Sequence, residues 1–342
     1  MNSSSEKTKM TKTGVVFFCA LICCFLWGSA FPCIKIGYSL FSIGASDSTS
    51  QIVFAGMRFT LAGILVILFG SLLQGKWLRP AKKNLLMVGK LSLVQTVGQY
   101  IFFYIGLAHT TGVKSSIIGA SNVFLSIVVA VAVFHMEKLS VKKVLGCLVG
   151  FAGVVLINVS GGSLDMNLSF LGEGFIFLSA VSYAFSSALI KRYSQEENPV
   201  TLKPGMVISD EPAMYRTLSG YQFLCGGILL TGFGLAMGGR VHVGAVSASG
   251  WLLLLYMGFI SAAAYTLWGI LLKYNPVARV AVFGFMNPVF GVLLSAIFLG
   301  ESGQAFGLAG VAALLLVCAG IMIVNGPAGE AKVQEPEGVA ER

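Results

Sequence analysis

Residues 25–38 read FLWGSAFPCIKIGY. The run is apolar enough to lie in a membrane, yet Trp27 stands in its interior and a proline and a lysine, Lys35, follow it. A partial copy, YAFSSALIKRY, begins 156 residues later, where Tyr183 takes the place of Trp27 and Lys191 that of Lys35. The two stretches indicate a membrane protein with related halves.

The composition of the 342-residue chain favours a membrane location. Hydrophobic residues make up 56% and charged residues 11%, with a mean hydropathy of +0.84, so polar surface is too scarce for a water-soluble globule. Continuous apolar stretches, each long enough to cross a hydrocarbon layer of about 30 Å, predict helices and not a barrel. We predict an all-α polytopic membrane protein with ten transmembrane helices, near residues 14–36, 51–74, 84–107, 113–134, 141–159, 172–190, 218–239, 250–272, 277–299 and 305–325.

The net charge of +9 is distributed by loop. If the N-terminus is cytoplasmic, eighteen lysines and arginines fall on the cytoplasmic side, and Lys35, Lys114 and Arg240 fall on the other. The positive-inside rule then predicts that both termini are cytoplasmic. We therefore expect a protein of the plasma membrane, surrounded by lipid and without a nucleic-acid partner.

Residues suited to catalysis or to metal binding are few. All seven cysteines lie within predicted spans without a CxxC pair, which argues against a zinc site or a disulfide framework. His109, His135 and His242 fall near span ends or in loops, away from any serine or carboxylate within the membrane. We expect no catalytic residue, no metal and no cofactor, and therefore not an enzyme.

The chain contains an internal repeat. At an offset of 164 residues Glu137 matches Glu301 and Gly146 matches Gly310. Each half holds five predicted spans, and because five is odd, the second copy is inverted relative to the first. Inverted repeats are a recurring construction of secondary transporters.

The repeat gives the predicted organisation of the chain. The two copies are five-helix bundles that face opposite ways in the membrane. A polar segment rich in proline interrupts the second copy and is interpreted as a linker, with partner docking as the alternative. The predicted units are a cytoplasmic N-terminus (1–13), the first repeat (14–159), the second repeat (172–325) with a cytoplasmic insertion (193–217), and a disordered cytoplasmic tail (326–342).

Three stretches resemble a known family. They are WGSAFPCIK in the first span, NVFLSIVVAVAVFHMEKLSVKKVLGCLVGFAGVVLI from the fourth span onward, and NPVFGVLLSAIFLGESGQAFGLAGVAALLLVCAGIMI from the ninth. Together they are similar to the two EamA-type repeats of the drug/metabolite transporter superfamily, over roughly residues 14–325. The resemblance implies ten helices in two inverted halves, cytoplasmic termini, and transport of small organic metabolites, often outward.

Aromatic residues are the first candidates for a solute site. Trp27 and Tyr183 lie deeper in their spans than the interfacial belt where such side chains usually anchor. Tyr100, Tyr265 and Trp268 offer further flat faces, and tyrosine adds a polar tip. We predict that these five side chains line a cavity that holds a partly apolar solute.

Polar side chains within the spans are the second group of candidates. Asn122 and Asn287 lie on stripes of small and polar residues at helical spacing, and an unpaired amide in hydrocarbon costs several kcal/mol. Gln99, Ser182 and Ser29 lie in three other spans. Contact with the solute and hydrogen bonding between helices are both open interpretations of these residues.

Arg58 is the most informative single residue. It lies seven residues into the second predicted span, roughly 10 Å by helix rise, where a charge is expensive and usually faces the bundle interior. It could pair with a carboxylate or phosphate of the solute, or reach the outer headgroups. Its repeat counterpart, Gln222, is neutral, so an anion site would involve mainly one half.

Small residues and prolines predict close packing and bending. Gly28 permits close helix approach, whereas Pro32 and Pro288 each remove a backbone hydrogen bond and favour a kink. Gly146 and Gly310 are predicted to let their helices pack closely.

These patterns predict a secondary transporter that moves a small organic metabolite by alternating access, with export as the family expectation. No Asp or Glu lies in the middle of a span, so a neutral or zwitterionic solute such as an amino acid is favoured over a cation. The alternatives are a nucleotide-sugar or phosphate-ester carrier, and a membrane enzyme or sensor whose cytoplasmic loop docks a partner. A homodimer is left open.

Charged residues at the span ends have two interpretations. Lys35 and Lys191 are expected to extend to the headgroups. Glu137 and Glu301 are expected to pair with nearby basic residues or to cap a following helix, and gating is the alternative.

Overall fold

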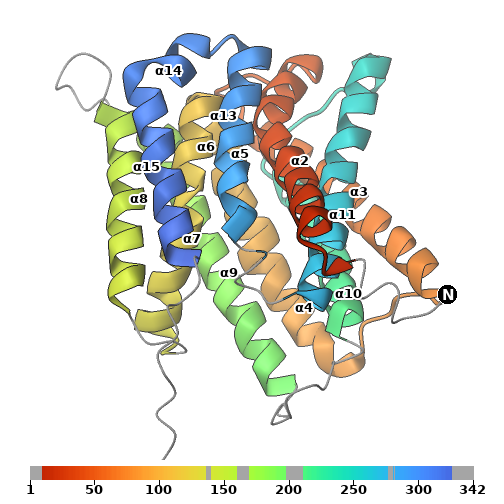
Figure 1. The fold of residues 1–342 in the computed structure, drawn as a ribbon. Coiled ribbons are helices and arrows are strands. Elements are labelled where there is room, and N and C mark those ends of the chain that lie inside the picture. Colours follow the sequence, from red (N-terminus) through yellow and green to blue (C-terminus); the bar gives the residue numbers. More distant parts are fainter. Residues whose placement is uncertain are drawn as a thin grey trace, which may run out of the picture.

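The computed structural model is an all-helical bundle (Figure 1). It describes residues 10–135, 140–159, 169–197, 211–275, 280 and 282–325, and over these ranges it contains no strand. Six helical segments are long and apolar enough to cross a membrane, and Phe283–Leu299 and Leu308–Val324 are shorter apolar helices. The polytopic, all-α prediction is therefore confirmed. The predicted tail, 326–342, lies outside the described residues.

Most predicted spans correspond to helices within a few residues. The longest are uninterrupted, whereas several others consist of an α-helix joined to a π- or 3₁₀-helical turn. The segments are α2 (Thr13–Leu40), α3 (Ser48–Gln74), η1 (Lys82–Asn84), α4 (Leu85–Leu91), η2 (Ser92–Gly98), α5 (Gln99–His109), α6 (Gly112–Gly119), α7 (Ser121–Val128), η3 (Val129–Val133), α8 (Val141–Val159), η4 (Phe170–Gly174), α9 (Phe175–Glu197), α10 (Glu211–Ala236), η5 (Val243–Ala245), α11 (Ala248–Tyr274), η6 (Val282–Phe285), α13 (Met286–Leu299), α14 (Ser302–Phe306) and α15 (Leu308–Asn325).

The polar insertion predicted at 193–217 is helical at both of its ends. Helix α9 continues to Glu197 and α10 begins at Glu211, so helical structure extends into both ends of it. Helix formers such as glutamate and glutamine let a helix run beyond its apolar part. Residues 198–210 lie outside the described part of the chain.

The two prolines expected to bend helices differ in position. Pro32 lies inside α2, which runs without a break from Thr13 to Leu40. Pro288 lies in the first turn of α13, directly after the 3₁₀ turn η6, where the missing N–H has no partner to lose. The change of geometry in this span therefore comes before Pro288 and not at it.

Segments far apart in the sequence pack along one another. Helix α3 lies against α10, α8 lies against α15, and α2 lies between α11 and α13. The α3–α10 contact is close enough that a Cβ on Gly63 would lie 2.4 Å from the backbone nitrogen of Leu224. A Cβ on Gly227 would meet the nitrogen of Thr60 at 2.3 Å. Glycine is therefore required on both helices of this pair.

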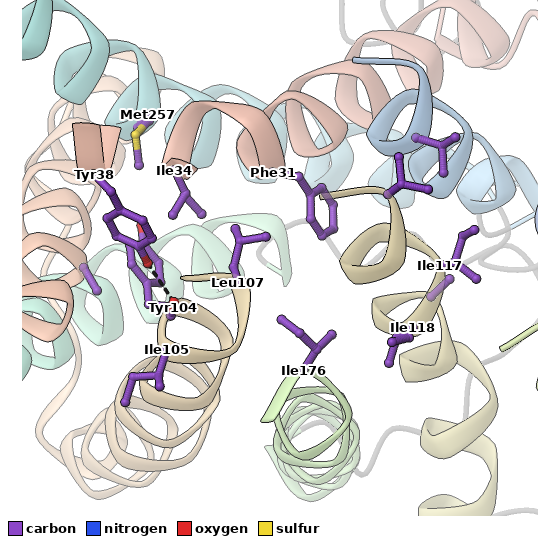
Figure 2. Close-up of a cluster of buried hydrophobic side chains, with 14 of the residues drawn as sticks. Phe31, Ile34, Tyr38, Tyr104, Ile105, Leu107, Ile117, Ile118, Ile176 and Met257 are labelled. Atoms are coloured by element: carbon purple, nitrogen blue, oxygen red, sulfur yellow. Dashed lines mark hydrogen bonds between the residues drawn. The ribbon is translucent and has the colours of Figure 1, made fainter. Parts of the chain in front are cut away.

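An apolar core runs through the bundle and draws on most of its helices, and Figure 2 shows part of it. Figure 2 shows side chains from α2, α5, α6 and α9 that point toward one another, and Met257 of α11 beside them. Tyr38 donates a hydrogen bond from its hydroxyl to the carbonyl oxygen of Tyr104 at 2.7 Å, which ties α2 to α5 inside this core. The contacts fix the helices that carry the polar residues described below.

The glycine contact between α3 and α10 generates a stability prediction. Gly63→Ala should destabilise the protein by about 1–3 kcal/mol, because the added methyl group meets backbone that cannot move aside. The measurement is the thermal unfolding midpoint of the purified protein in detergent. Gly232→Ala on α10 is the matched control, since nothing lies within 4 Å of a Cβ at that position. Equal midpoints for the two variants would contradict this account of the contact.

Candidate functional site

A chain of aromatic rings crosses the middle of the bundle and joins five helices. The Trp27 ring lies 5.2 Å from that of Trp268 and 5.7 Å from that of Tyr265, measured between centroids. From Tyr265 the contacts continue through two buried phenylalanines to Tyr100, whose ring lies 3.9 Å from that of Phe59. We call this set the aromatic cluster, and its members are Trp27, Phe59, Tyr100, Phe223, Tyr265 and Trp268.

Arg58 lies at one edge of the aromatic cluster. Its side chain is 4% exposed, and its guanidinium stands over the Phe59 ring at 5.1 Å from the centroid. Nε donates a hydrogen bond to the carbonyl oxygen of Met257 at 3.3 Å, and Nη1 donates to the hydroxyl of Tyr104 at 3.0 Å. Of the two interpretations that the sequence left open, this burial favours a charge that faces protein over one that reaches the headgroups.

No acidic side chain among the described residues forms an ion pair with Arg58. Its partners are a carbonyl, a hydroxyl and an aromatic face, all of them neutral. A full charge taken out of water costs several kcal/mol even after relaxation, and neutral partners offset only part of that cost. An anion bound beside Arg58 would therefore stabilise this buried charge.

Two amide oxygens near the aromatic cluster have no hydrogen-bond partner among the described residues. One is Oε1 of Gln99, which precedes Tyr100 in α5, and the other is Oε1 of Gln222, which precedes Phe223 in α10. The Gln222 amide nitrogen is already used, since it donates to Gln95 Oε1 at 2.9 Å. Burying an acceptor of this kind destabilises the protein unless a hydrogen-bond donor reaches it.

The other predicted polar residues have more varied surroundings. The Ser182 hydroxyl donates to the carbonyl of Val94 at 2.7 Å and so joins α9 to η2. The Ser29 hydroxyl donates to Leu26 O and shares a hydrogen bond of 2.9 Å with the Tyr256 hydroxyl. Ser182 therefore links two helical segments, whereas Ser29 forms hydrogen bonds both within α2 and with Tyr256 of α11.

Three predicted residues remain partly exposed. Tyr183 lies close enough to interact electrostatically with Tyr100 and Tyr265, which places it beside the aromatic cluster. Asn122 and Asn287 are half-buried, and Oδ1 of Asn287 has no partner among the described residues. Among the described residues, neither asparagine forms a hydrogen bond with a member of the aromatic cluster.

The glycines predicted to permit packing lie at different kinds of contact. A Cβ on Gly28 would meet the Gly291 nitrogen at 2.8 Å, so α2 and α13 approach backbone to backbone. A Cβ on Gly146 would meet Gly320 O at 2.9 Å, at the α8–α15 contact. Gly310 instead lies against the carbonyl of Gln304, inside the corner that joins α14 to α15.

Several residues of the site were not singled out by the sequence analysis. Phe59 and Phe223 are fully buried, and they follow Arg58 and Gln222 at the same 164-residue offset, a signal that was present in the repeat. Tyr104, which holds the guanidinium, lies one helical turn after Tyr100. Counting one helical turn onward from Tyr100, which the sequence analysis had named, points to Tyr104.

The charged residues at one end of the bundle pair across the chain. Lys35 Nζ lies 3.7 Å from Glu301 Oε1, and Lys114 Nζ lies 3.0 Å from Glu173 Oε1. The expectation that Lys35 extends to the headgroups is therefore wrong, because a carboxylate and the carbonyl of Thr110 lie within its reach. Glu301 pairs with a basic residue, as expected, but one that is distant in sequence.

Over the described residues, no group of three or more His, Cys, Asp and Glu side chains is placed to hold a metal ion. The arrangement that is present combines aromatic faces, a buried cation and unsatisfied acceptors inside a bundle of apolar helices. It is suited to holding a small solute within a membrane.

Fold and site together define a multi-pass membrane transport protein. A sequence model of the EamA-like transporter family matches residues 14–159 and 211–326, and the chain belongs to this family. The resemblance noted in the sequence is thus confirmed.

Relatives along nearly the whole chain carry transporter names. An "uncharacterized transporter" of Archaeoglobus fulgidus is 28% identical over 87% of this chain and 94% of its own. A "probable amino-acid metabolite efflux pump" of Salmonella typhimurium is 26% identical over 90% and 93%. The "uncharacterized inner membrane transporter YedA" of Escherichia coli K12 is 28% identical over 81% and 80%.

A solved crystal structure has a similar fold. It matches with a TM-score of 0.60 over 91% of this chain and 96% of its own length. The sequence identity is 17%, so the similarity concerns the fold alone.

The uncompensated charge of Arg58 generates a second prediction. Arg58→Met should leave the thermal unfolding midpoint of the solute-free protein unchanged or raise it, because an apolar side chain of similar length replaces an unpaired buried cation. Tyr104→Phe is the comparison, and it should lower the midpoint, since it leaves the guanidinium with one partner fewer. A large loss of stability in Arg58→Met would show that the neutral partners already satisfy the charge.

Proposed function

We propose that this protein is a secondary transporter that exports a small zwitterionic metabolite, such as an amino acid, across the plasma membrane by alternating access. The observation that carries the proposal is a buried arginine that has no acidic partner among the described residues and lies at the edge of an aromatic cluster in a transporter fold. Such a site holds a net positive charge and apolar walls. It is complementary to a solute with a carboxylate and an apolar body.

Each group of an amino acid has a chemical complement in the site. A carboxylate would accept from the guanidinium of Arg58, in a charge-assisted pair that a low-dielectric site strengthens. An ammonium group would donate to the free amide oxygens of Gln99 and Gln222. The rings of Trp27 and Tyr265 would cover the side chain. One solute would thus satisfy groups that are otherwise left without partners.

The packing supports a bundle of ten transmembrane helices in two inverted halves. Helix α3 packs on α10 and α8 packs on α15, and each pair joins helices that occupy equivalent places in the two halves. The contact of α2 with α11 has an equivalent in that of α9 with α5. Halves related in this way can exchange conformations, which opens one central site to either side of the membrane in turn.

Export is favoured over import by the relatives. The Salmonella typhimurium protein carries the name of an efflux pump for amino-acid metabolites. A phosphate-ester or nucleotide-sugar carrier is less well supported, because phosphate groups attract several cations and Gln222 stands where the repeat would place a second one. These points support an exporter of small zwitterions.

The test of function compares solutes with and without a carboxylate. Purified protein should gain thermal stability from L-leucine or L-phenylalanine and not from their C-terminal amides, which lack the anion. Arg58→Gln should abolish the gain, and Trp27→Ala should reduce it by roughly tenfold in apparent affinity, as for the loss of one aromatic contact plus its buried area. Metabolite profiling of the medium should show export lost in parallel. Equal responses to the acids and their amides would contradict the carboxylate contact.

The inverted arrangement has its own test. Single cysteines placed at Lys76 and Lys142 should react with an impermeant maleimide from the cytoplasmic face only, and a cysteine at Arg240 from the outer face only. Labelling of intact cells, and of inside-out vesicles as the control, measures this. If Lys76→Cys and Arg240→Cys, which the 164-residue offset makes equivalent, were labelled from the same face, the halves would not be inverted as proposed.

A further inference from the structure

The corner between α5 and α6, residues 109–114, is held from two sides. On one side is Glu301, from the junction of α13 and α14, and on the other is Glu173, from η4 at the start of α9. The corner lies near the C-terminal end of α2, because Lys35 Nζ donates to Thr110 O at 2.6 Å. The charge distribution predicts this end to be the outer one.

Glu301 binds the corner through backbone amides. Its Oε1 accepts from the nitrogen of Gly112 at 3.0 Å, and its Oε2 accepts from that of Val113 at 2.8 Å. These are free N–H groups at the start of α6, so a carboxylate from another part of the chain caps this helix. Lys35 lies beside the same carboxylate, and the Thr111 hydroxyl is hydrogen-bonded to Gln304 Oε1.

Glu173 binds the corner through side chains. Its Oε1 accepts from the Thr110 hydroxyl at 2.8 Å and from Lys114 Nζ at 3.0 Å. Its Oε2 accepts from the backbone nitrogen of Ser169 at 3.0 Å. The Glu173 side chain is 8% exposed, so this pair is largely withdrawn from water and is stronger than a surface ion pair.

The backbone around the corner is also in close contact. A Cβ on Gly112 would lie 2.5 Å from the Ser295 hydroxyl oxygen, and one on Gly172 would lie 2.8 Å from the carbonyl oxygen of His109. Beneath the corner, Phe31, Leu107 and Ile176 point into the shared core (Figure 2). Polar and apolar contacts together therefore close this end of the bundle.

We propose that the α5–α6 corner is the gate at this end of the transport path, held closed by the Glu301 and Glu173 carboxylates. That the corner controls the passage of a solute rests on the proposed function. The contacts that hold the corner are independent of it. The two carboxylates come from different parts of the chain and bind the same short stretch, so the corner cannot move away from either one without losing hydrogen bonds. Opening requires the simultaneous loss of several charge-assisted hydrogen bonds, which makes the gate a two-state device.

The repeat places related residues at the other end of the bundle. Lys191 corresponds to Lys35, and Glu137 corresponds to Glu301. The side chain of Lys191 and the whole of Glu137 lie outside the described residues. The proposal therefore concerns one gate only.

A native cysteine can report whether the gate is open. Cys33 is half-buried in α2, two residues before Lys35, and it packs against the apolar core under the corner. An impermeant maleimide, added outside intact cells, should reach it only when the corner moves away. Peptide mass spectrometry resolves the reaction at Cys33 from that at Cys225, a half-buried cysteine of α10 that serves as the internal reference.

Removing either carboxylate charge should open the gate. Glu173→Gln and Glu301→Gln are each expected to raise the labelling rate of Cys33 roughly tenfold, the effect of losing a charge-assisted hydrogen bond. Asp47→Asn is the matched control, because Asp47 accepts from Ser50 N at the start of α3 and does not touch the corner. Its Cys33 rate should equal that of the wild type. Unchanged Cys33 labelling in both glutamine variants would overturn the proposal.

A second variant keeps the test valid if a glutamine variant fails to accumulate. Lys114→Gln leaves both carboxylates and the helix cap in place, and it should raise Cys33 labelling in the same direction; an unchanged rate would overturn the proposal. The readout needs no knowledge of the solute. If the variants raised Cys33 labelling but the protein gave no response to amino acids, the gate would be supported and the proposed function would be contradicted. If Cys33 labelling stayed unchanged while export was normal, the gate would be contradicted and the proposed function would be supported.

Discussion

Helices in lipid gain little by hiding apolar surface from one another, so this bundle depends on how closely their backbones approach. Glycines set that distance at the main contacts between the two halves. Gly63 and Gly227 bring α3 against α10 with no room for a side chain, and Gly146 does the same for α8 against α15. Each contact joins one half of the chain to the other. The same contacts fix the positions of the helices that carry Arg58 and Gln222, which are α3 and α10.

Few charged side chains lie within the described part of the bundle, and they occupy two kinds of environment. Lys35 and Lys114 have carboxylate partners at one end, while Arg58 has only neutral partners near the middle. The contrast matters because the cost of an unpaired charge rises as water is excluded. The described ion pairs lie at the proposed gate, whereas Arg58, which has no acidic partner among the described residues, lies beside the aromatic cluster.

The sequence predicted the class of fold because apolar length locates a span. It offered a buried Arg58 as one of two interpretations, because a charge seven residues inside a span usually faces the bundle interior but can also reach the headgroups. Contacts between distant segments were not predictable in this way. Lys35 and Glu301 are separated by most of the chain, and nothing near either residue indicates the other. Pro288 shows a smaller limit: its residue type predicts a kink, but its effect depends on where the helix begins.

Helix α5 links the proposed gate to the proposed site. It carries Tyr104, whose hydroxyl holds Arg58, and it ends at the corner that the two carboxylates grip. Helix α2 contacts it twice, through Tyr38 to the carbonyl of Tyr104 and through Lys35 to that of Thr110. Tyr38 and Lys35 are three residues apart and share one face of α2, so the two helices are fastened along a length of about one turn. A movement of the corner therefore pulls on the tyrosine that partners the guanidinium. Conversely, in the proposed mechanism a solute carboxylate that took the place of that hydroxyl on Arg58 would weaken one of the contacts that hold α5, and solute binding would thereby favour opening of the proposed gate.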